Sequence, residues 1–137
     1  MKNIYNFILT FVLSIGTSIN LFTQPLPPGI KGVAPIGGAV PTVMTTSATE
    51  ITSASATLGG NVTADGGSAV TESGIVYSLT DESPTIAENA TKVAISSGTG
   101  TFSEAINSLS ENTTYYYNAY AINSIGVSYG TASNVCD

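Results

Sequence analysis

The residue types that carry most enzyme chemistry are absent from this sequence or lie at its end. The 137 residues include no histidine and no arginine, and Cys136 is the only cysteine. Without these residues, the usual pairs of nucleophile and base and the usual transition-metal sites cannot be assembled. A lone cysteine also has no partner for an internal disulfide. The sequence therefore argues against an enzyme, and we expect neither a catalytic residue nor a cofactor.

Acidic side chains are the only remaining candidates for metal ligands. Asp81, Glu82 and Glu88 fall within one predicted loop and could offer oxygen atoms to Ca²⁺. Their spacing matches no calcium-binding loop, so we interpret them as solvated acids and expect no metal site.

Two tyrosines, Tyr116 and Tyr120, are the candidates for a ligand-binding site. They belong to a run from Thr113 to Ile122 that is rich in aromatic and β-branched residues, which predicts a strand. Alternation along the strand places both on one face, and the opposite face carries Tyr115, Tyr117, Ala119 and Ala121. An exposed tyrosine pair could stack on a sugar or anchor a protein partner. Tyrosines also decorate sheet surfaces because they pack well across strands, so both interpretations stay open.

The charge balance excludes two classes of partner. The net charge is −6, and the only basic residues are Lys2, Lys31 and Lys92. Nucleic acids are bound by clustered Lys or Arg, and anionic membrane surfaces attract the same residues. We therefore expect neither nucleic acid nor a membrane surface as the partner.

The first 23 residues predict an export signal. Lys2 gives the positive start and Ile4 to Ile15 gives the apolar stretch that a signal peptide requires. Cleavage could follow Thr23 or, earlier, Ser18. The alternative is an uncleaved anchor helix, but polar residues and a glycine interrupt the run before it reaches the length of a membrane span. The mature protein would then be secreted or on the outer cell surface, without membrane insertion.

Residues 24–41 predict a linker, because they hold five of the six prolines and several glycines. From residue 42 to 137 the pattern changes to short strands separated by turn residues, which indicates an all-β domain. The expected strands are 42–46, 55–62, 70–78, 91–96, 102–107 and 113–122, with another beginning at Val127. Alternation places Glu104 on the inward face with Phe102 and Ile106, so we expect either a bulge or an edge strand there.

The end of the sequence resembles a fibronectin type III domain. The pattern Leu109-x-Glu-x-Thr113-x-Tyr115, continued by Ala121, Asn123, Gly126 and Ser128, is similar to the last part of that family, with Glu111 where a proline is usual. Upstream, the segments 56–63, 65–68 and 74–77 look like the fibronectin-type modules of exported Bacteroidota proteins. The resemblance covers about residues 41–137.

The resemblance implies a seven-stranded, immunoglobulin-like Greek-key sandwich. In that fold Asp65-Gly66 lies in a loop that crosses between sheets, and Tyr115 is the tyrosine-corner residue, its hydroxyl bonded to upstream backbone. Leu58 would replace the usual core tryptophan. The loops 65–69, 96–100 and 123–126 would meet at one end of the sandwich.

The function implied is a non-catalytic spacer or adhesion element that meets a protein or polysaccharide at the cell surface. The alternative is a carbohydrate-binding accessory module that uses Tyr116 and Tyr120.

Overall fold

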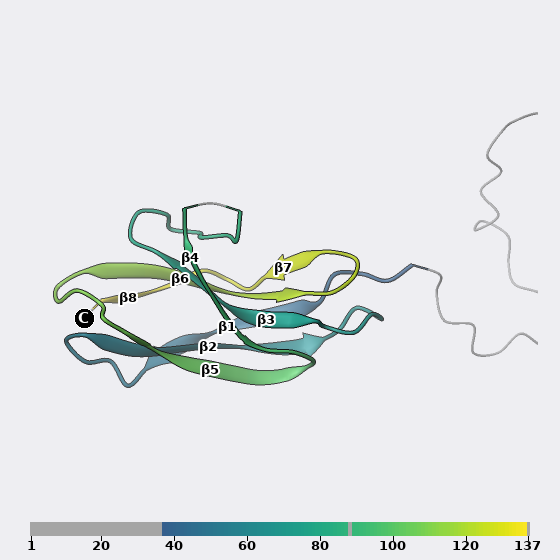
Figure 1. Ribbon diagram of the computed structural model, residues 1–137, viewed down its shortest axis with the longest axis horizontal. Helices are drawn as coiled ribbons and strands as arrows, with labels where there is room; N and C mark the ends of the chain where they lie inside the picture. The colour runs from purple at the N-terminus through teal and green to yellow at the C-terminus, as the bar shows by residue number, and fades with distance from the viewer. Residues whose placement is uncertain (1–36, 88, 137) are drawn as a thin grey trace, which may run out of the picture. The chain divides into compact units, whose positions relative to one another are not determined.

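The computed structural model describes residues 37–87 and 89–136, and every regular element within them is a β-strand (Figure 1). The predicted signal peptide (1–23) and most of the predicted linker (24–41) lie outside these residues. The strands are β1 (Thr42–Thr49), β2 (Ser55–Ala64), β3 (Glu72–Ser78), β4 (Thr91–Ser96), β5 (Gly100–Asn107), β6 (Thr114–Ile122), β7 (Val127–Tyr129) and β8 (Ser133–Cys136).

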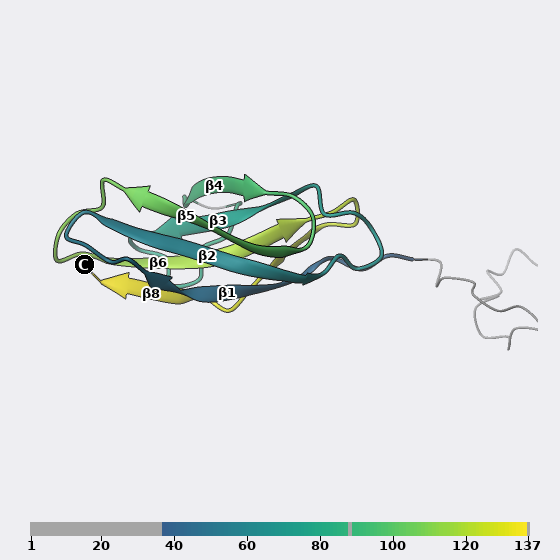
Figure 2. The same cartoon turned by 90° about the horizontal axis from the view of Figure 1, so that it is seen from below.

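The strands form two antiparallel sheets. One has the order β1-β2-β5, and Figure 2 shows β2 between its two neighbours. The other has the order β4-β3-β6-β7, and β8 also pairs with β6. The chain crosses from β2 in the first sheet to β3 in the second through Asp65-Gly66, as the fibronectin resemblance implied. The prediction of an all-β sandwich is confirmed, with the last strand expected from the sequence divided here into β7 and β8.

A threonine of β1 hydrogen-bonds to the backbone of β6 at the break between β7 and β8. At the break, the N–H of Gly130 donates to the carbonyl of Ala119 (2.9 Å), and the N–H of Ala119 donates to Thr45 Oγ1 (3.0 Å). Thr45 Oγ1 in turn donates to Asn118 Oδ1 (3.0 Å). A side chain at position 130 would strike the backbone and side chain of Thr45, so this close approach needs glycine. The backbone of β6 therefore stays hydrogen-bonded where its neighbouring strand is interrupted.

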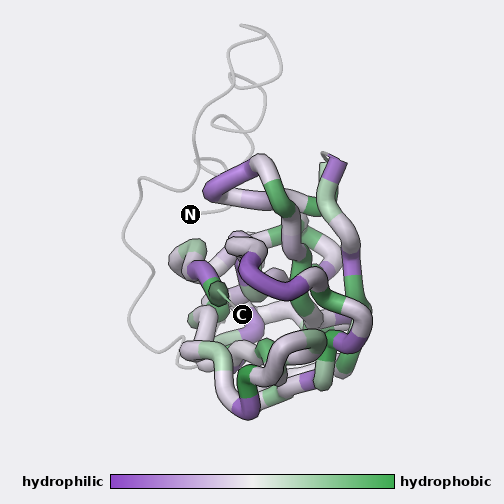
Figure 3. The backbone as a smooth tube through the Cα atoms, turned by 90° about the vertical axis from the view of Figure 1, so that its left-hand side faces the viewer, coloured by the Kyte–Doolittle hydropathy of each residue, from purple (hydrophilic) through white to green (hydrophobic). Residues whose placement is uncertain are grey.

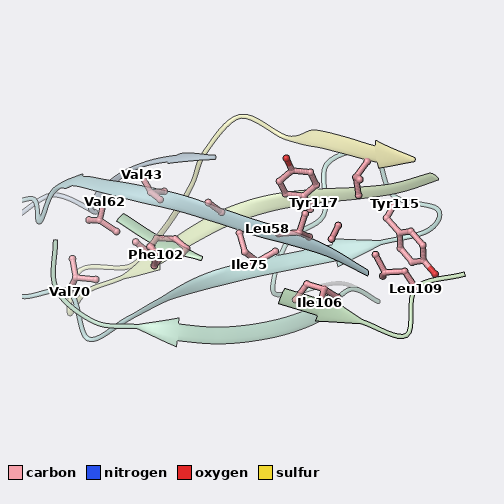
Figure 4. Close-up of a cluster of buried hydrophobic side chains, with 14 residues drawn as sticks. Val43, Leu58, Val62, Val70, Ile75, Phe102, Ile106, Leu109, Tyr115 and Tyr117 are labelled. Carbon is pink, nitrogen blue, oxygen red and sulfur yellow. The ribbon is translucent and has the colours of Figure 1, made fainter. Parts of the chain in front are cut away.

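The core lies between the sheets and is built by alternating residues of their facing sides (Figure 4). Figure 3 shows the corresponding mixture of hydrophilic and hydrophobic residues along the strands. Leu58 is 1% exposed and occupies the core position expected of it. Gly60 allows the sheets to approach, because a Cβ there would strike Ala119 and Phe102. The remaining large core residues are Val43, Val62, Val70, Ile75, Ile106, Leu109, Tyr115, Tyr117 and Val135.

The position of β5 in its sheet explains how Glu104 can face inward without being buried. Phe102 and Ile106 are buried, whereas Glu104 is exposed. β5 pairs with β2 without any register shift, so the bulge offered as one alternative is absent. The other alternative holds: β5 lies at the edge of its sheet, and the carboxylate reaches water.

The packed part of the chain begins slightly before β1. The N–H of Ala39 donates to the carbonyl of Gly66 (2.8 Å), and Pro41 is buried. The last residues of the predicted linker are thus part of the domain.

Candidate functional site

Three loops and the entering chain meet at one end of the sandwich, which we call the loop end (residues 38–41, 65–69, 96–100 and 123–126). Ser68 Oγ and Ser124 Oγ are 2.7 Å apart. The N–H of Gly98 donates to the carbonyl of Val70 (2.9 Å), which ties the β4–β5 loop to the β2–β3 segment. The clustering of loops expected from the sequence is present.

Asn123 is the centre of the loop end. Its side chain is 4% exposed and uses both its donor and its acceptor atoms. Nδ2 donates to the carbonyls of Ala39 (2.7 Å) and Asp65 (2.8 Å). Oδ1 accepts from the N–H groups of Ile125 (2.9 Å) and Gly126 (3.1 Å). A fully bonded buried amide fixes three segments relative to one another, which gives the loop end a defined surface.

That surface presents two aliphatic side chains to solvent. Val40 is 40% exposed and Ile125 is 51% exposed. The glycines beside them allow close packing, because a Cβ at Gly38 would meet Ile125 and one at Gly126 would meet Val40. A rigid apolar pair with a polar surround is the kind of surface that proteins use to contact other proteins.

Tyr120 does not lie on an exposed surface, and the expectation of an exposed tyrosine pair is wrong. Its side chain is 0% exposed, although it points away from the core between the sheets. Its hydroxyl donates to Glu72 Oε1 (2.7 Å), which also accepts from Lys92 Nζ at 2.6 Å. Lys92 Nζ lies 5.5 Å from the centre of the Tyr120 ring, within range of a cation–π contact. Gly74 faces Tyr120 across the strands, and a Cβ there would lie 3.0 Å from the Tyr120 hydroxyl.

These contacts shift two pKa values. The hydrogen bond from Lys92, and after it the one from Tyr120, holds the pKa of Glu72 below its ordinary value. Burial, and after it the hydrogen bond to Glu72, raises the pKa of Tyr120 well above the ordinary value for a phenol. Glu72 therefore stays ionised and Tyr120 neutral across the physiological range.

Residues 79–87, which follow β3, cover this second face of the sheet. In Figure 1 they rise on the side of β6 that is turned away from β2 and β5. Val76, on the same face as Tyr120, is 0% exposed, and Pro84 of the segment is fully buried. The N–H of Ile86 donates to the hydroxyl of Tyr129 (3.1 Å). The described part of this predicted loop thus covers the face, which its composition did not indicate.

Tyr116 is only partly buried, and its cross-strand partner on β3 lines a polar hollow. Its partners across the strands are Ser78 on β3 and Asn134 on β8. Ser78 lines a hollow of about 560 Å³, and an adjoining hollow of about 280 Å³ shares part of its wall. The structure therefore gives the two predicted residues different surroundings: Tyr120 is fully buried, whereas Tyr116 is partly exposed and pairs with a residue of the hollow.

The hollow is lined by hydrogen-bonding side chains. Ser78, Thr80, Asp81 and Asn89 line its larger part, and the rings of Tyr77 and Tyr115 border the smaller one. Asp81 Oδ1 accepts from the N–H of Ser83 (2.9 Å), whereas Asp81 Oδ2 is buried without a partner among the described residues. Glu82 is exposed, and Glu88 lies outside the described residues. No group of three or more His, Cys, Asp or Glu side chains in the described part of the chain could hold a metal ion.

Comparisons with known proteins identify the fold. No protein-family model matches the sequence, and the search of curated proteins gives no match. A fibronectin type III domain of human collagen XX superposes with a TM-score of 0.52 at 20% identity, covering 77% of this chain and 100% of that one. The chain has the fibronectin type III fold. The sensor domain of the anti-sigma factor RsgI4 from Pseudobacteroides cellulosolvens superposes with a TM-score of 0.51 at 20% identity, covering 72% of this chain and 94% of that one. A structure described as a myokine superposes with a TM-score of 0.51 at 22% identity, covering 73% of this chain and 97% of that one.

Tyr115 makes the hydroxyl contact that the fibronectin type III fold leads one to expect. Its hydroxyl oxygen accepts from the N–H of Ser110 at 3.0 Å, and its ring lies beside Leu109 (Figure 4). Tyr77 meets the ring edge-on, with centroids 6.2 Å apart. Both Tyr115 and Leu109 are 7% exposed. The contact closes the end of the sandwich opposite the loop end.

Sequence reasoning missed the role of Glu72 and Lys92. Lys92 pairs across the strands with Val76, four residues from Glu72 along β3, so the two side chains meet along the outer face without being direct cross-strand neighbours. Simple cross-strand pairing of opposite charges therefore gave no signal for this contact. Among the described residues, no helix is long and apolar enough to span a membrane.

Proposed function

We propose that this protein is a non-catalytic, secreted or surface-exposed module that acts as a spacer or adhesion element and meets a protein partner through its loop end. The observation that carries the proposal is the buried Asn123, whose four hydrogen bonds hold Val40 and Ile125 in a fixed exposed position. The absence of histidine and arginine from the sequence supports a role without catalysis. The signal-like first 23 residues support export.

The fold supports the same proposal. One similar structure is a domain of a collagen and another is the sensor domain of an anti-sigma factor. Sandwich folds of this kind carry recognition on loops at their ends, where sequence can vary without disturbing the core.

Two measurements test the proposal. Protease added to intact cells of the source organism should degrade the protein, and full protection from protease until the cells are lysed would overturn the surface location. Beads coated with the purified protein should bind those cells, and the Val40→Ser/Ile125→Ser variant should bind at least tenfold less. Met44→Ser is the matched control, because Met44 is 58% exposed but lies on β1 outside the loop end. Equal binding by the loop-end variant would contradict a role for this surface.

The alternative function, carbohydrate binding, is now better supported at the hollow than at a tyrosine pair. The hydroxyl, amide and carboxylate groups of the hollow can hydrogen-bond to a sugar, and the partly exposed Tyr77 borders its smaller part. Retention on insoluble polysaccharide, lost in Thr80→Ala/Asn89→Ala and in Tyr116→Ala but kept in Thr101→Ala, would support it. No retention on any polymer would remove it.

A further inference from the structure

The edge of β5 is unlike the other sheet edges of the described chain. β1 has two register shifts, and its Thr45 and Thr46 are bonded to side chains and backbone of β6. β7 and β8 are separated by a break, and β4 has a shift opposite Ser73. β5 instead pairs with β2 through eight consecutive residues without a shift and contains no proline. Long regular edges are the ones that accept another strand.

The free edge can be assigned to particular residues. A Cβ at Gly59 on β2 would strike the carbonyl oxygen of Phe102, so this carbonyl points toward β2. Bonding groups alternate in direction along a strand, so the N–H and C=O groups of Thr101, Ser103 and Ala105 point away from β2. In agreement, the carbonyl of Ala105 accepts from the side chain of its near neighbour Asn107 (3.3 Å).

The charges of this protein indicate which kind of strand could pair with the edge of β5. Glu104 is the only charged residue of β5, and it is exposed between the buried Phe102 and Ile106. Seven of the nine acidic residues lie in the described part of the chain, against Lys92 as its only basic residue, and Lys92 is bonded to Glu72. A second copy of this chain would bring like charges together, whereas a basic segment would meet opposite charge at position 104.

We propose that β5 is a docking edge for an extended peptide segment of another protein, with Lys or Arg facing Glu104. The segment adds a fourth strand to the β1-β2-β5 sheet and bonds to the backbone of Thr101, Ser103 and Ala105. Backbone bonds supply affinity in this type of recognition, and the pairing at Glu104 supplies preference for a basic partner. The docking edge lies on the side of the sandwich, on a different element from Val40 and Ile125 of the loop end.

The test follows amide hydrogen exchange by NMR while a blocked peptide of alternating threonine and valine, with lysine at its centre, is added to the protein. We expect slower exchange at Thr101, Ser103 and Ala105, and no change at Phe102, Glu104 and Ile106, whose amides already face β2. A peptide with glutamate in place of the lysine should give at least a threefold smaller protection. Unchanged exchange at the three edge amides would overturn the proposal. Protection of these amides that appears without peptide and grows with protein concentration would also overturn it, because that result indicates self-association.

Two variants sharpen the test. Ser103→Pro removes one outward N–H without removing a bond to β2, a substitution that edge strands tolerate, and should weaken peptide binding at least tenfold; Ser103→Ala is its matched control. Glu104→Lys changes an exposed side chain, so it should fold and should reverse the preference in favour of the glutamate peptide. An unchanged preference would contradict the role of Glu104. Val40→Ser/Ile125→Ser should leave peptide binding intact, which separates this proposal from the loop-end function.

Discussion

The two faces of β6 both bury tyrosines, but they hold the hydroxyl groups in different ways. On the inner face, Tyr115 accepts from the N–H of Ser110, and Tyr117 donates to the carbonyl of Thr46 at 2.9 Å. On the outer face, Tyr120 donates to the carboxylate of Glu72, which Lys92 also contacts. The inner contacts join the sheets and their connections through backbone. The outer contact depends on an ionised side chain.

Because of this difference, we expect the hydroxyl contacts of the inner face to stabilise the fold equally at all pH values and the contact of the outer face to stabilise it in a pH-dependent way. Because the folded-state pKa of Glu72 is lowered, its contribution is present above the ordinary value of 4.5 and is lost as the pH falls through the folded pKa. Because the pKa of Tyr120 is raised, its contribution is present below the ordinary value of 10.0 and is lost as the pH rises toward the folded pKa. The outer face is therefore weakened by both strong acid and strong alkali.

The largest effect should come from the packing of the inner face. Leu58 is 1% exposed and lies in the same cluster as Tyr117 (Figure 4). Leu58→Ala leaves a cavity and should lower the free energy of unfolding by about 2–5 kcal/mol. Urea denaturation measures this loss, which should be the same at neutral pH and near pH 4.5 because no ionisable group is involved. Met44→Ala, at an exposed position, should change stability by less than about 0.5 kcal/mol, and an equal loss in both variants would contradict the core assignment.

A smaller effect should follow from removing the outer hydroxyl. Tyr120→Phe deletes a hydrogen bond to a charged group, which should cost about 1.5–3 kcal/mol at neutral pH. The loss should shrink as the pH falls below 4.5, because protonated Glu72 accepts more weakly. The variant should also lose less stability above pH 10 than the wild type does.

The control for this experiment is the double-mutant cycle with Glu72→Gln. Tyr120→Phe should cost clearly less in that background than in the wild type. Additive losses would show that the hydroxyl and the carboxylate do not act as a pair.

The corresponding change on the inner face should be smaller and insensitive to pH. Tyr115→Phe removes a neutral hydrogen bond between Ser110 and the phenol, which should cost about 1 kcal/mol. Thermal unfolding at several pH values measures it. An unchanged melting temperature would contradict the role assigned to this tyrosine, and a loss that varies across the acidic range would contradict the proposed difference between the faces.

The inner face was predictable from sequence, and the outer face was not. Alternation in β2 and β6 placed Leu58 and Tyr117 in the core, and the motif around Tyr115 indicated its hydroxyl contact. Alternation says only that Tyr116 and Tyr120 share the other face. Whether that face is open depends on the β3–β4 segment, whose acids and single proline indicated a solvated loop. The burial of Pro84 and the hydrogen bond from the N–H of Ile86 to Tyr129 are tertiary contacts, and no periodic pattern in the sequence predicts them.

The smallest predicted effect concerns a hydroxyl that the inner face leaves without a partner. Ser73 is 0% exposed and sits across from Ala121, yet its Oγ has no hydrogen-bond partner among the described residues. An unpaired buried hydroxyl costs free energy that alanine does not. Ser73→Ala should therefore be neutral or should stabilise the fold by up to about 1 kcal/mol, as measured by urea denaturation. Ser128→Ala, which removes a similarly unpartnered hydroxyl on the other side of Ala121, should behave alike but more weakly because Ser128 is partly exposed. Destabilisation by Ser73→Ala would contradict this prediction and would mean that a bound water hydrogen-bonds to the hydroxyl. Polar contacts other than those of Tyr115 and Tyr117 would then also contribute to the stability of the inner face.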